Sequence, residues 1–488
     1  MHAPASKTAF CRKLIGLLAP AAACLLAAPA FAAVGLLDAV KADNLPAVKQ
    51  LIQAHADPNA AETDGTTALQ WAVSRRDAKL VEVLLDAGAR AGAVNRYGVG
   101  ALYLACQNGD AAVVAALLRH GADPNAAVPG GETPLMTAAR TGDVATLEAL
   151  VAAGAHVGMR ESRKGQTALM WAAAENNAAA VKFLLEHGAE RDAKSNGGEF
   201  TAFTFAVRGG AVDAVRALLE AGADANAKLT DGTSALVLAV ENAHYELASV
   251  LLEHGADPNA HDQGWTALHQ ITWSRQWNVG FNLPGPARTG TLSSLDLVRQ
   301  LVAHGADVNA RLTIPPRDGN RNMLNRIGAT PFLLAAKRCD LPLMHLLLDL
   351  GADPSVKTGD GTTALMAAAG IGIWAQGEDP GTIEEALAAV KLAFQVGGGK
   401  INDANAHGET ALHGAAYRGA IPVIKWLVEH GARLDAVNDK GWMPVTITDG
   451  VEYTPCVIKL YPEAAALLRS YMAKQGLHVP PPPVTNSS

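Results

Sequence analysis

The phrase "LLRHGADPNA" at 117–126 returns along this 488-residue chain as "LLEAGADANA" at 218–227 and "LLEHGADPNA" at 251–260. A second phrase, Gly-x-Thr-Ala/Pro-Leu, returns with it, and most of its copies follow one another at a nearly constant spacing. Its third position, the Thr slot, holds Thr67, Gly100, Thr133, Thr167, Thr201, Ser234, Thr266, Thr330, Thr363, Thr410 and Met443. A period of about 33 residues predicts an array of small units, because a unit of this size buries its apolar face only against its neighbours.

Each period carries the signals of two helices and a turn. A Thr at the slot, such as Thr133, caps a first helix by accepting a backbone N–H bond, and small residues follow, as in "LMTAA". The second helix has apolar residues at helical spacing, such as Val113, Val114, Leu117 and Leu118. A glycine ends it, because glycine adopts the left-handed conformation at least cost. The segment "ADPNA" then turns the chain out into a finger and back.

Three stretches, "DGTTALQWAV", "GGETPLMTAA" and "HGETALHGAA", match the pattern Thr-Pro-Leu-His-x-Ala. In this pattern the chain resembles the ankyrin repeat family. The resemblance implies an all-α fold, an ankyrin-repeat solenoid of about twelve helix-turn-helix units with β-turn fingers over residues 33–476. The first unit lacks a capped start and the last is degenerate, as terminal units usually are. The Pro-rich residues 477–488 are expected to form a disordered tail.

Residues 1–32 have the features of a secretory signal peptide. A basic start, "MHAPASKTAFCRK", precedes the apolar run "LIGLLAPAAACLLAAP" and a small-residue exit at Ala30–Ala32. The run is too short to span a bilayer stably, and no other apolar stretch reaches spanning length without charges. We therefore expect a bacterial-type exported protein, periplasmic or secreted, with no transmembrane segment in the mature chain. Lipidation of Cys24 stays open, because "AAAC" lacks the usual Leu.

The charge of the chain argues against nucleic acid as a partner. The chain has 40 basic and 47 acidic residues, and the signal peptide takes away three basic residues and no acid. The mature chain then has 37 basic against 47 acidic residues, or about −10. Non-specific binding to nucleic acid needs a basic footprint, which this balance does not supply.

The period is broken by four insertions in the C-terminal half, near 273–291, 311–327, 370–382 and 449–462. Three of them fall at the turn between the two helices of a unit, two units apart, so that neighbouring insertions lie about 20 Å from one another and extended loops there are close enough to touch. Five tryptophans lie in or beside this half: Trp265, Trp273, Trp277, Trp374 and Trp442. The other three occupy regular helix positions and are expected in the core: Trp71, Trp171 and Trp426. Two interpretations stay open. The aromatics of the insertions form a local core under their own loops, or they form an exposed binding surface.

Most histidines recur at the repeat period and therefore lie too far apart to bind one ion. Those before a helix-ending glycine are expected to face the C-terminal end of the helix dipole: His120, His187, His254, His304 and His430. His269 and His413 follow "TAL", where the family's histidine supports the neighbouring turn.

No nucleophile, metal or nucleotide motif is found, and Thr382 with Glu385 predicts a capping box. The three remaining cysteines, Cys106, Cys339 and Cys456, lie in different units, too far apart to pair. We expect no catalytic residue, no metal and no cofactor.

Candidate binding residues follow from their position in the unit. In ankyrin-like arrays partners commonly dock on the finger tips and the ends of the first helices, and Arg with aromatic residues is a common anchor chemistry. The candidates are Arg75, Arg140, Arg208, Trp265, Trp273, Trp277, Lys337, Arg338, Trp374, Tyr417, Arg418 and Trp442. The finger tips and the ends of the first helices together line a concave groove. We therefore expect a non-catalytic, monomeric protein–protein interaction scaffold of the bacterial cell envelope, which binds a protein partner through this groove and the insertions. The alternatives are a glycan or cell-wall binder that uses the insertion tryptophans, and an enzyme assembled from the insertions.

Overall fold

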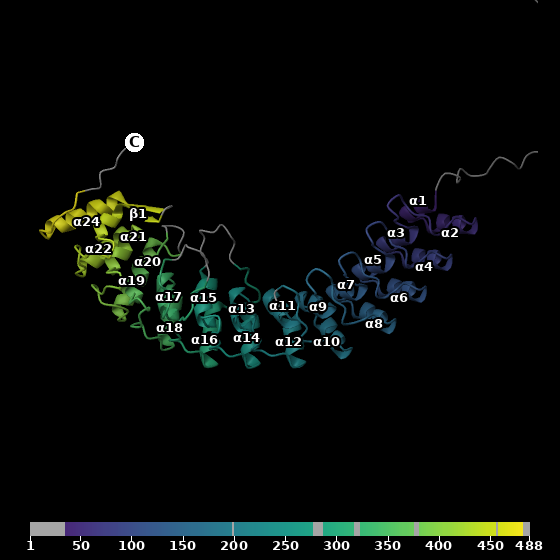
Figure 1. Cartoon of the computed structure of the whole chain (residues 1–488), viewed down its shortest axis with the longest axis horizontal. Helices are drawn as coiled ribbons and strands as arrows, with labels where there is room; N and C mark the ends of the chain where they lie inside the picture. The colour runs from purple at the N-terminus through teal and green to yellow at the C-terminus, as the bar shows by residue number, and fades with distance from the viewer. Residues whose placement is uncertain are drawn as a thin grey trace, which may run out of the picture. The chain divides into compact units, whose positions relative to one another are not determined.

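The computed structural model describes residues 35–197, 200–276, 286–316, 323–374, 380–454 and 457–481 (Figure 1). The chain forms two compact units, Met1–Ala101 and Leu102–Ser488. The predicted signal peptide, Trp277, Cys456 and most of the predicted tail lie outside the described residues. Parts of all four predicted insertions lie outside them as well.

The described residues of the first unit form two helix pairs. Their bounds are α1 (Leu36–Lys41), α2 (Leu45–Gln53), α3 (Ala68–Ser74) and α4 (Ala78–Asp86). Ten further pairs follow in the described part of the chain. The first helices of these pairs are α5 (Ala101–Asn108), α7 (Pro134–Thr141), α9 (Ala168–Ala174), α11 (Ala202–Gly209), α13 (Ala235–Glu241), α15 (Ala267–Arg275), α17 (Pro331–Lys337), α19 (Ala364–Ala369), α21 (Ala411–Arg418) and α23 (Pro444–Thr448). The second helices are α6 (Ala111–Arg119), α8 (Val144–Ala152), α10 (Ala178–Glu186), α12 (Val212–Glu220), α14 (Tyr245–Glu253), α16 (Ser294–Ala303), α18 (Leu341–Asp349), α20 (Ile383–Gln395), α22 (Ile421–Glu429) and α24 (Pro462–Lys474).

The predicted caps start the first helices. The Thr133 hydroxyl accepts the N–H of Met136 at 3.2 Å, and the Ser234 hydroxyl accepts that of Val237 at 3.2 Å. The helix-ending glycines have positive φ as predicted, for example +83° at Gly121 after α6. In the last repeat the first helix, α23, has no side-chain cap and only five residues, which agrees with a degenerate terminal unit.

Within the second unit the helices form two layers (Figure 1). The first helices pack in series, α7 against α9, α9 against α11 and so on to α23. The second helices pack likewise from α6 to α16 and again from α18 to α24. Between the layers lie small and branched side chains such as Ala138, Leu147 and Leu150, which are fully buried. Alanine on the first helices allows neighbouring backbones to approach closely, so the thin units form one continuous core.

The Asn of "ADPNA" explains why this phrase recurs. Asn125 Nδ2 donates to the carbonyl of Gly154 at 3.1 Å, and its Oδ1 accepts the N–H of His156 at 2.8 Å. The same two bonds, to the next helix-ending glycine and to the residue two positions after it, are made by Asn59, Asn226, Asn259, Asn309 and Asn402. Each Asn therefore satisfies a carbonyl and an N–H that the end of the next helix leaves without partners.

The insertions contain the one departure from an all-α fold in the described part of the chain. In the last unit β1 (Asp449–Thr454) pairs antiparallel with β2 (Val457–Leu460). From β2, Lys459 Nζ donates to the carbonyl of Trp374 at 2.6 Å, so the fourth insertion contacts the third, as expected for loops on this edge. The second insertion reaches the third as well, because Met323 N donates to the carbonyl of Gly372. The first insertion begins later than predicted, since α15 continues to Arg275.

Candidate binding site between two fingers

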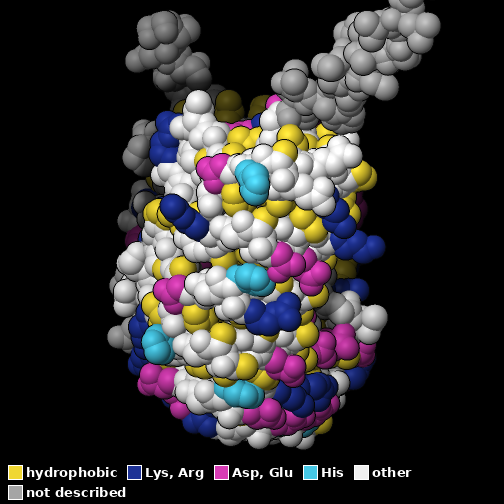
Figure 2. Space-filling view, turned by 90° about the vertical axis from the view of Figure 1, so that its right-hand side faces the viewer, with side chains coloured by type: hydrophobic (Ala, Val, Ile, Leu, Met, Phe, Trp, Pro, Cys, Tyr) yellow, Lys and Arg dark blue, Asp and Glu magenta, His cyan; other side chains and the backbone are white. Residues whose placement is uncertain are grey.

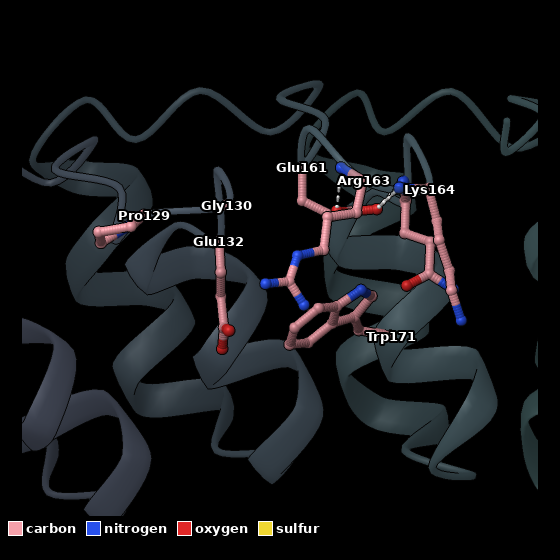
Figure 3. A pocket seen from close by; sticks show the side chains of 8 residues that line it. Pro129, Gly130, Glu132, Glu161, Arg163, Lys164 and Trp171 are labelled. Carbon is pink, nitrogen blue, oxygen red and sulfur yellow. Dashed lines mark hydrogen bonds between the residues drawn. The ribbon is translucent and has the colours of Figure 1, made fainter. Parts of the chain in front are cut away.

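A pocket of about 270 Å³ lies between two neighbouring fingers and α9 (Figure 3). We call this space the finger pocket. Its lining residues are Pro129, Gly130, Glu132, Glu161, Arg163, Lys164, Gln166 and Trp171. The first three come from the finger before α7, the next four from the finger before α9, and Trp171 from α9 itself. The repeat therefore builds the pocket, because each finger returns to the start of the next first helix.

The indole of Trp171 is the apolar wall of the finger pocket. The side chain is half-buried, and the Arg140 guanidinium lies 5.2 Å from its ring centroid, within cation–π distance. Its Nε1–H is buried and meets no acceptor in the described part of the chain. The indole therefore offers a ring face to the pocket rather than a hydrogen bond.

The Glu132 carboxylate holds the Arg140 side of the pocket in place. It accepts the hydroxyl of Thr137 at 3.0 Å and that of Tyr103 at 3.4 Å, and it lies 3.6 Å from Arg140 Nη2. Burial, and then the charge of Glu132, raise the pKa of the Tyr103 phenol, so this hydroxyl stays protonated and donates. Two hydroxyl groups and the Arg140 guanidinium therefore already interact with the Glu132 carboxylate.

The Glu161 carboxylate shapes the second finger. It accepts the backbone N–H groups of Arg163 at 2.7 Å, Lys164 at 2.6 Å and Gln166 at 3.1 Å. Burial by itself raises the pKa of this carboxyl, but these backbone donors outweigh it and hold the pKa below the usual range. Glu161 is therefore ionised, and its charge is met by the backbone of its own turn and, to a smaller extent, by the nearby charge of Arg163.

The side chains of Arg163 and Lys164 are the charged donors of the pocket, beside the neutral amide of Gln166. Both are exposed, and no hydrogen bond from either side chain to another described residue is found. Figure 3 shows the Arg163 guanidinium between the Glu132 carboxylate and the indole of Trp171. An incoming group would meet a guanidinium, an ammonium and an aromatic ring together.

Close contact between the two fingers depends on glycine. The carbonyl of Gly130 accepts both the N–H of Ser162 at 2.8 Å and its hydroxyl at 2.7 Å. Gly131 has φ +85°, and a Cβ there would lie 2.8 Å from Ser162 N. A side chain at Gly131 would therefore be strained and would also push the fingers apart.

We expect Gly131→Ala to destabilise the chain more than Gly154→Ala. At Gly154, with φ +94° and open space around it, the left-handed backbone alone costs about 1 kcal/mol. At Gly131 the clash with the second finger adds about 1–3 kcal/mol. Urea unfolding of both variants followed by circular dichroism measures the difference. Equal losses would show that contact between the fingers contributes nothing to stability.

The remaining predicted residues of the regular units lie on exposed helix ends. Arg208, at the end of α11, is exposed and lies 4.8 Å from the ring centroid of Phe200 and 5.3 Å from that of Phe205. Arg75 follows α3 in the first unit and is exposed. Arg140 and Arg208 therefore both lie against an aromatic ring. Arg75 belongs to the other compact unit, residues 1–101.

In the C-terminal half the structure corrects the prediction of surface contacts for several residues. Trp273 is only 8% exposed and packs edge-to-face with Trp265 at 6.0 Å between ring centroids, beneath the Arg326 guanidinium. Trp265 is half-buried, and its Nε1 donates to Gln270 at 2.8 Å. These aromatics form a local core under the insertions, which is the first of the two interpretations left open by the sequence.

Two neighbouring units bury further candidates. Lys337 is 5% exposed at the end of α17, and the half-buried Arg338 donates to the carbonyl of Gln276. On α21, Tyr417 is 1% exposed and donates to Glu409 at 2.8 Å, and Arg418 is 3% exposed. A partner cannot reach side chains covered to this extent, so the predicted contacts of Lys337, Tyr417 and Arg418 are wrong.

The other two tryptophan candidates are half-buried and take part in internal contacts. Trp374 provides the carbonyl that holds Lys459. Trp442 provides a carbonyl bonded to His413 at 3.1 Å, and the Lys440 ammonium lies 4.7 Å from its ring centroid. These hydrogen bonds are made by the backbone carbonyls, so a binding role of the two indoles stays a prediction, and Trp277 lies outside the described residues.

Sequence reasoning missed the centre of the finger pocket. Trp171 was expected in the core, like Trp71 and Trp426, but all three are half-buried. Arg163 and Lys164 were not singled out. A basic pair at a finger tip, "SRKGQT", followed by an aromatic residue four positions after Thr167, was the available signal.

The histidines have the structural roles predicted for them. Each of the five before a helix-ending glycine, such as His120, places Nδ1 near the carbonyl four residues earlier, at 2.7 to 2.9 Å. His269 and His413 are fully buried and link their own cap to the next finger. Burial lowers the pKa of each to about 4, against the opposing effect of their backbone bonds.

The described residues have neither a metal-binding cluster nor a membrane-spanning helix. No group of three or more His, Cys, Asp or Glu side chains there could hold a metal ion. No described helix is long and apolar enough to cross a membrane. Cys106 and Cys339 are buried free thiols. Figure 2 shows acidic, basic and histidine side chains interspersed on one face, without a large field of one sign.

Stacked helix pairs linked by hydrogen-bonded fingers define a helical repeat protein. The model for ankyrin repeats (three copies) matches residues 36–128, 123–195, 203–281 and 332–438. The chain therefore belongs to the ankyrin repeat family, and ankyrin repeats indicate a protein–protein interaction scaffold.

The curated relatives match this chain over only part of their own length. Human ankyrin repeat and SOCS box protein 16 is 32% identical over 241 residues, 44% of this chain and 47% of that protein. Human ankyrin repeat and SOCS box protein 6 is 33% identical over 139 residues, 28% of this chain and 26% of that protein. The chain thus spans about half or less of these relatives. A crystal structure of the human ASB11 ankyrin repeat domain is 27% identical, covers 46% of this chain and 98% of that one, and has a TM-score of 0.41.

Proposed function

We propose that this chain is a non-catalytic scaffold that binds a protein partner through the finger pocket and the adjacent ends of the first helices. The observation that carries the proposal is the Trp171 indole beside two basic side chains for which no bond to another described residue is found, at a place where two fingers meet. Tryptophan and arginine are the residues most enriched among energetic hot spots of protein interfaces. The insertion aromatics support a glycan-binding surface less well, because Trp265 and Trp273 pack against each other.

Photo-crosslinking tests the proposed surface. Benzoylphenylalanine would replace exposed Pro129 at the edge of the finger pocket in one variant, and exposed Glu148 on α8 in a matched control. After irradiation in cells of the source organism, a discrete crosslinked protein is expected from position 129 and not from position 148. Identical products from both positions, or none from either, would contradict a binding surface at the fingers.

We further propose that the chain acts outside the cytoplasm of a bacterial cell. The proposal rests on the basic, apolar and small-residue regions of residues 1–32. Fractionation of cells that express the whole chain or a chain without residues 2–32 tests it. Export and removal of the predicted signal peptide are expected for the whole chain alone, and retention of both forms in the cytoplasm would overturn the proposal.

A further inference from the structure

The inference developed here rests on the proposed function, because it assigns the chemistry of the partner at the same surface. We infer that the finger pocket takes a side-chain carboxylate from an extended acidic segment of the partner. Arg163 and Lys164 would bind the carboxylate, and the methylene groups that carry it would lie against the Trp171 indole.

The distribution of charge within the pocket favours an anion. Among its acids, Glu132 is met by Arg140 and two hydroxyls, and Glu161 by three backbone N–H groups. The pocket's remaining polar side chains are the neutral amide of Gln166 and the charged groups of Arg163 and Lys164, and for these two charged groups no hydrogen bond to another described residue is found. A guanidinium binds a carboxylate with two parallel hydrogen bonds, which are among the stronger ones in proteins.

The basic character is concentrated on the finger that carries Arg163 and Lys164. Arg160, on the same finger, donates to the carbonyl of Gly165 and to that of Lys194 on the next finger. This finger thus has three basic residues and one acid, Glu161, in a chain whose net charge is −7. A local excess of positive charge attracts a segment with several acidic residues, because complementary charge speeds encounter and sets the register.

The acids in the pocket distinguish a carboxylate from a phosphate. Glu132 and Glu161 line the same space, and a phosphate with nearly two negative charges would be repelled more strongly than a carboxylate with one. A nucleic acid strand would need phosphate contacts at many successive positions, and acidic side chains interrupt the basic ones around it. The carboxylate of an acidic peptide fits these constraints with fewer unfavourable contacts.

Fluorescence anisotropy with labelled peptides tests the inference. The probes are the decapeptide (Glu-Ser)5 and its neutral counterpart (Gln-Ser)5, added to the purified chain at low salt. We expect the acidic probe to bind and the neutral one not to bind. The variant Arg163→Gln/Lys164→Gln should weaken binding at least about tenfold, since these side chains make no described internal hydrogen bond and the fold should persist.

A matched variant removes the same charge elsewhere. Lys182→Gln/Arg216→Gln lies on the second helices, where these exposed residues pair with Glu220 and Glu253. It should leave the affinity for (Glu-Ser)5 unchanged within about twofold. Equal weakening by both variants, or equal binding of both peptides, would overturn the inference. Tighter binding of deca-deoxythymidylate or of a phosphoserine peptide at the same pocket would overturn it in favour of a phosphate.

The two experiments fail separately. A crosslinked partner at position 129 without binding of (Glu-Ser)5 would keep the proposed function and overturn the carboxylate. Binding of (Glu-Ser)5 that depends on Arg163 and Lys164, without a crosslinked protein, would keep the carboxylate site and overturn the proposed function.

Discussion

The variant Asp340→Ala is expected to lose about 3–5 kcal/mol of unfolding free energy in the C-terminal half of the array. Asp340 is 2% exposed, and its carboxylate binds the Arg275 guanidinium through two bonds, of 2.8 and 3.1 Å. It also caps α18 by accepting the N–H of Leu343 at 3.2 Å. Removing it leaves a largely buried guanidinium without its counter-charge and a helix without its cap, and both effects destabilise the fold.

Two control variants separate these effects. The double variant Arg275→Met/Asp340→Asn removes the charge pair and keeps a capping side chain, so it should recover much of the lost stability. Asp296→Ala removes a carboxylate from an exposed pair with Arg299 and should cost at most about 1–2 kcal/mol, much of it from the Ser293–Asp296 cap. Urea unfolding with hydrogen exchange of α15 and α18 gives the local stabilities. A loss below about 1 kcal/mol for Asp340→Ala would show that Arg275 finds water when its partner is removed.

Acid is expected to destabilise the chain through its two buried cap histidines. The pKa of His413 falls from 6.5 to about 4 on folding because burial disfavours the charged ring. Its Nδ1 accepts the N–H of Thr410 at 3.1 Å, which only the neutral ring can do. The stabilisation is complete above pH 6.5, where the unfolded ring is also neutral, and it is lost as the pH falls toward 4. The loss is about 3 kcal/mol for each such histidine.

The compact unit of residues 1–101 has a glutamine at the equivalent position, which suggests the substitution that tests this pH dependence. Gln70 occupies the position of His413, accepts the N–H of Thr67 at 2.7 Å and donates to the carbonyl of Val99 at 2.6 Å. His413→Gln should therefore keep the link between cap and finger without titrating. At pH 7 the variant should lie within about 1 kcal/mol of the original chain, and by pH 4 it should have lost about 3 kcal/mol less.

Unfolding by urea at pH 7, 6, 5 and 4 measures this difference. Thr410→Val is a suitable comparison, since it removes the capping hydroxyl and leaves the histidine to titrate. Parallel pH profiles for the original chain and His413→Gln would mean that His413 is protonated within the folded array.

Local signals in the sequence predicted most of the scaffold. The Thr cap, the helix-ending glycine and the spacing of apolar residues each act within one unit, and the structure has a helix pair at nearly every one of them. The structural roles of His120 and His413 could be predicted for the same reason, because their partners lie on the same helix or the next finger. What the sequence left uncertain was how the irregular segments would fold back on regular units.

Four residues show this limit clearly, because all of them stand seven positions after the Thr slot. Arg140 and Arg208 remain at least partly exposed beside an aromatic ring. Lys337 and Tyr417 are buried, and they lie in the half where the insertions contact one another. The position in the repeat is the same in each case, and only the tertiary structure decides which of these side chains is buried.

The sequence by itself thus determined the repeating helix pairs, their caps and the family, because hydrogen bonds and apolar faces recur with the period of the repeat. Only the tertiary structure decided where a partner can reach. It buried Trp273 under the first insertion, formed the β1–β2 hairpin and brought Arg163 and Lys164 beside Trp171. The physical reason is that burial depends on contacts between segments far apart in the chain, which no local pattern records.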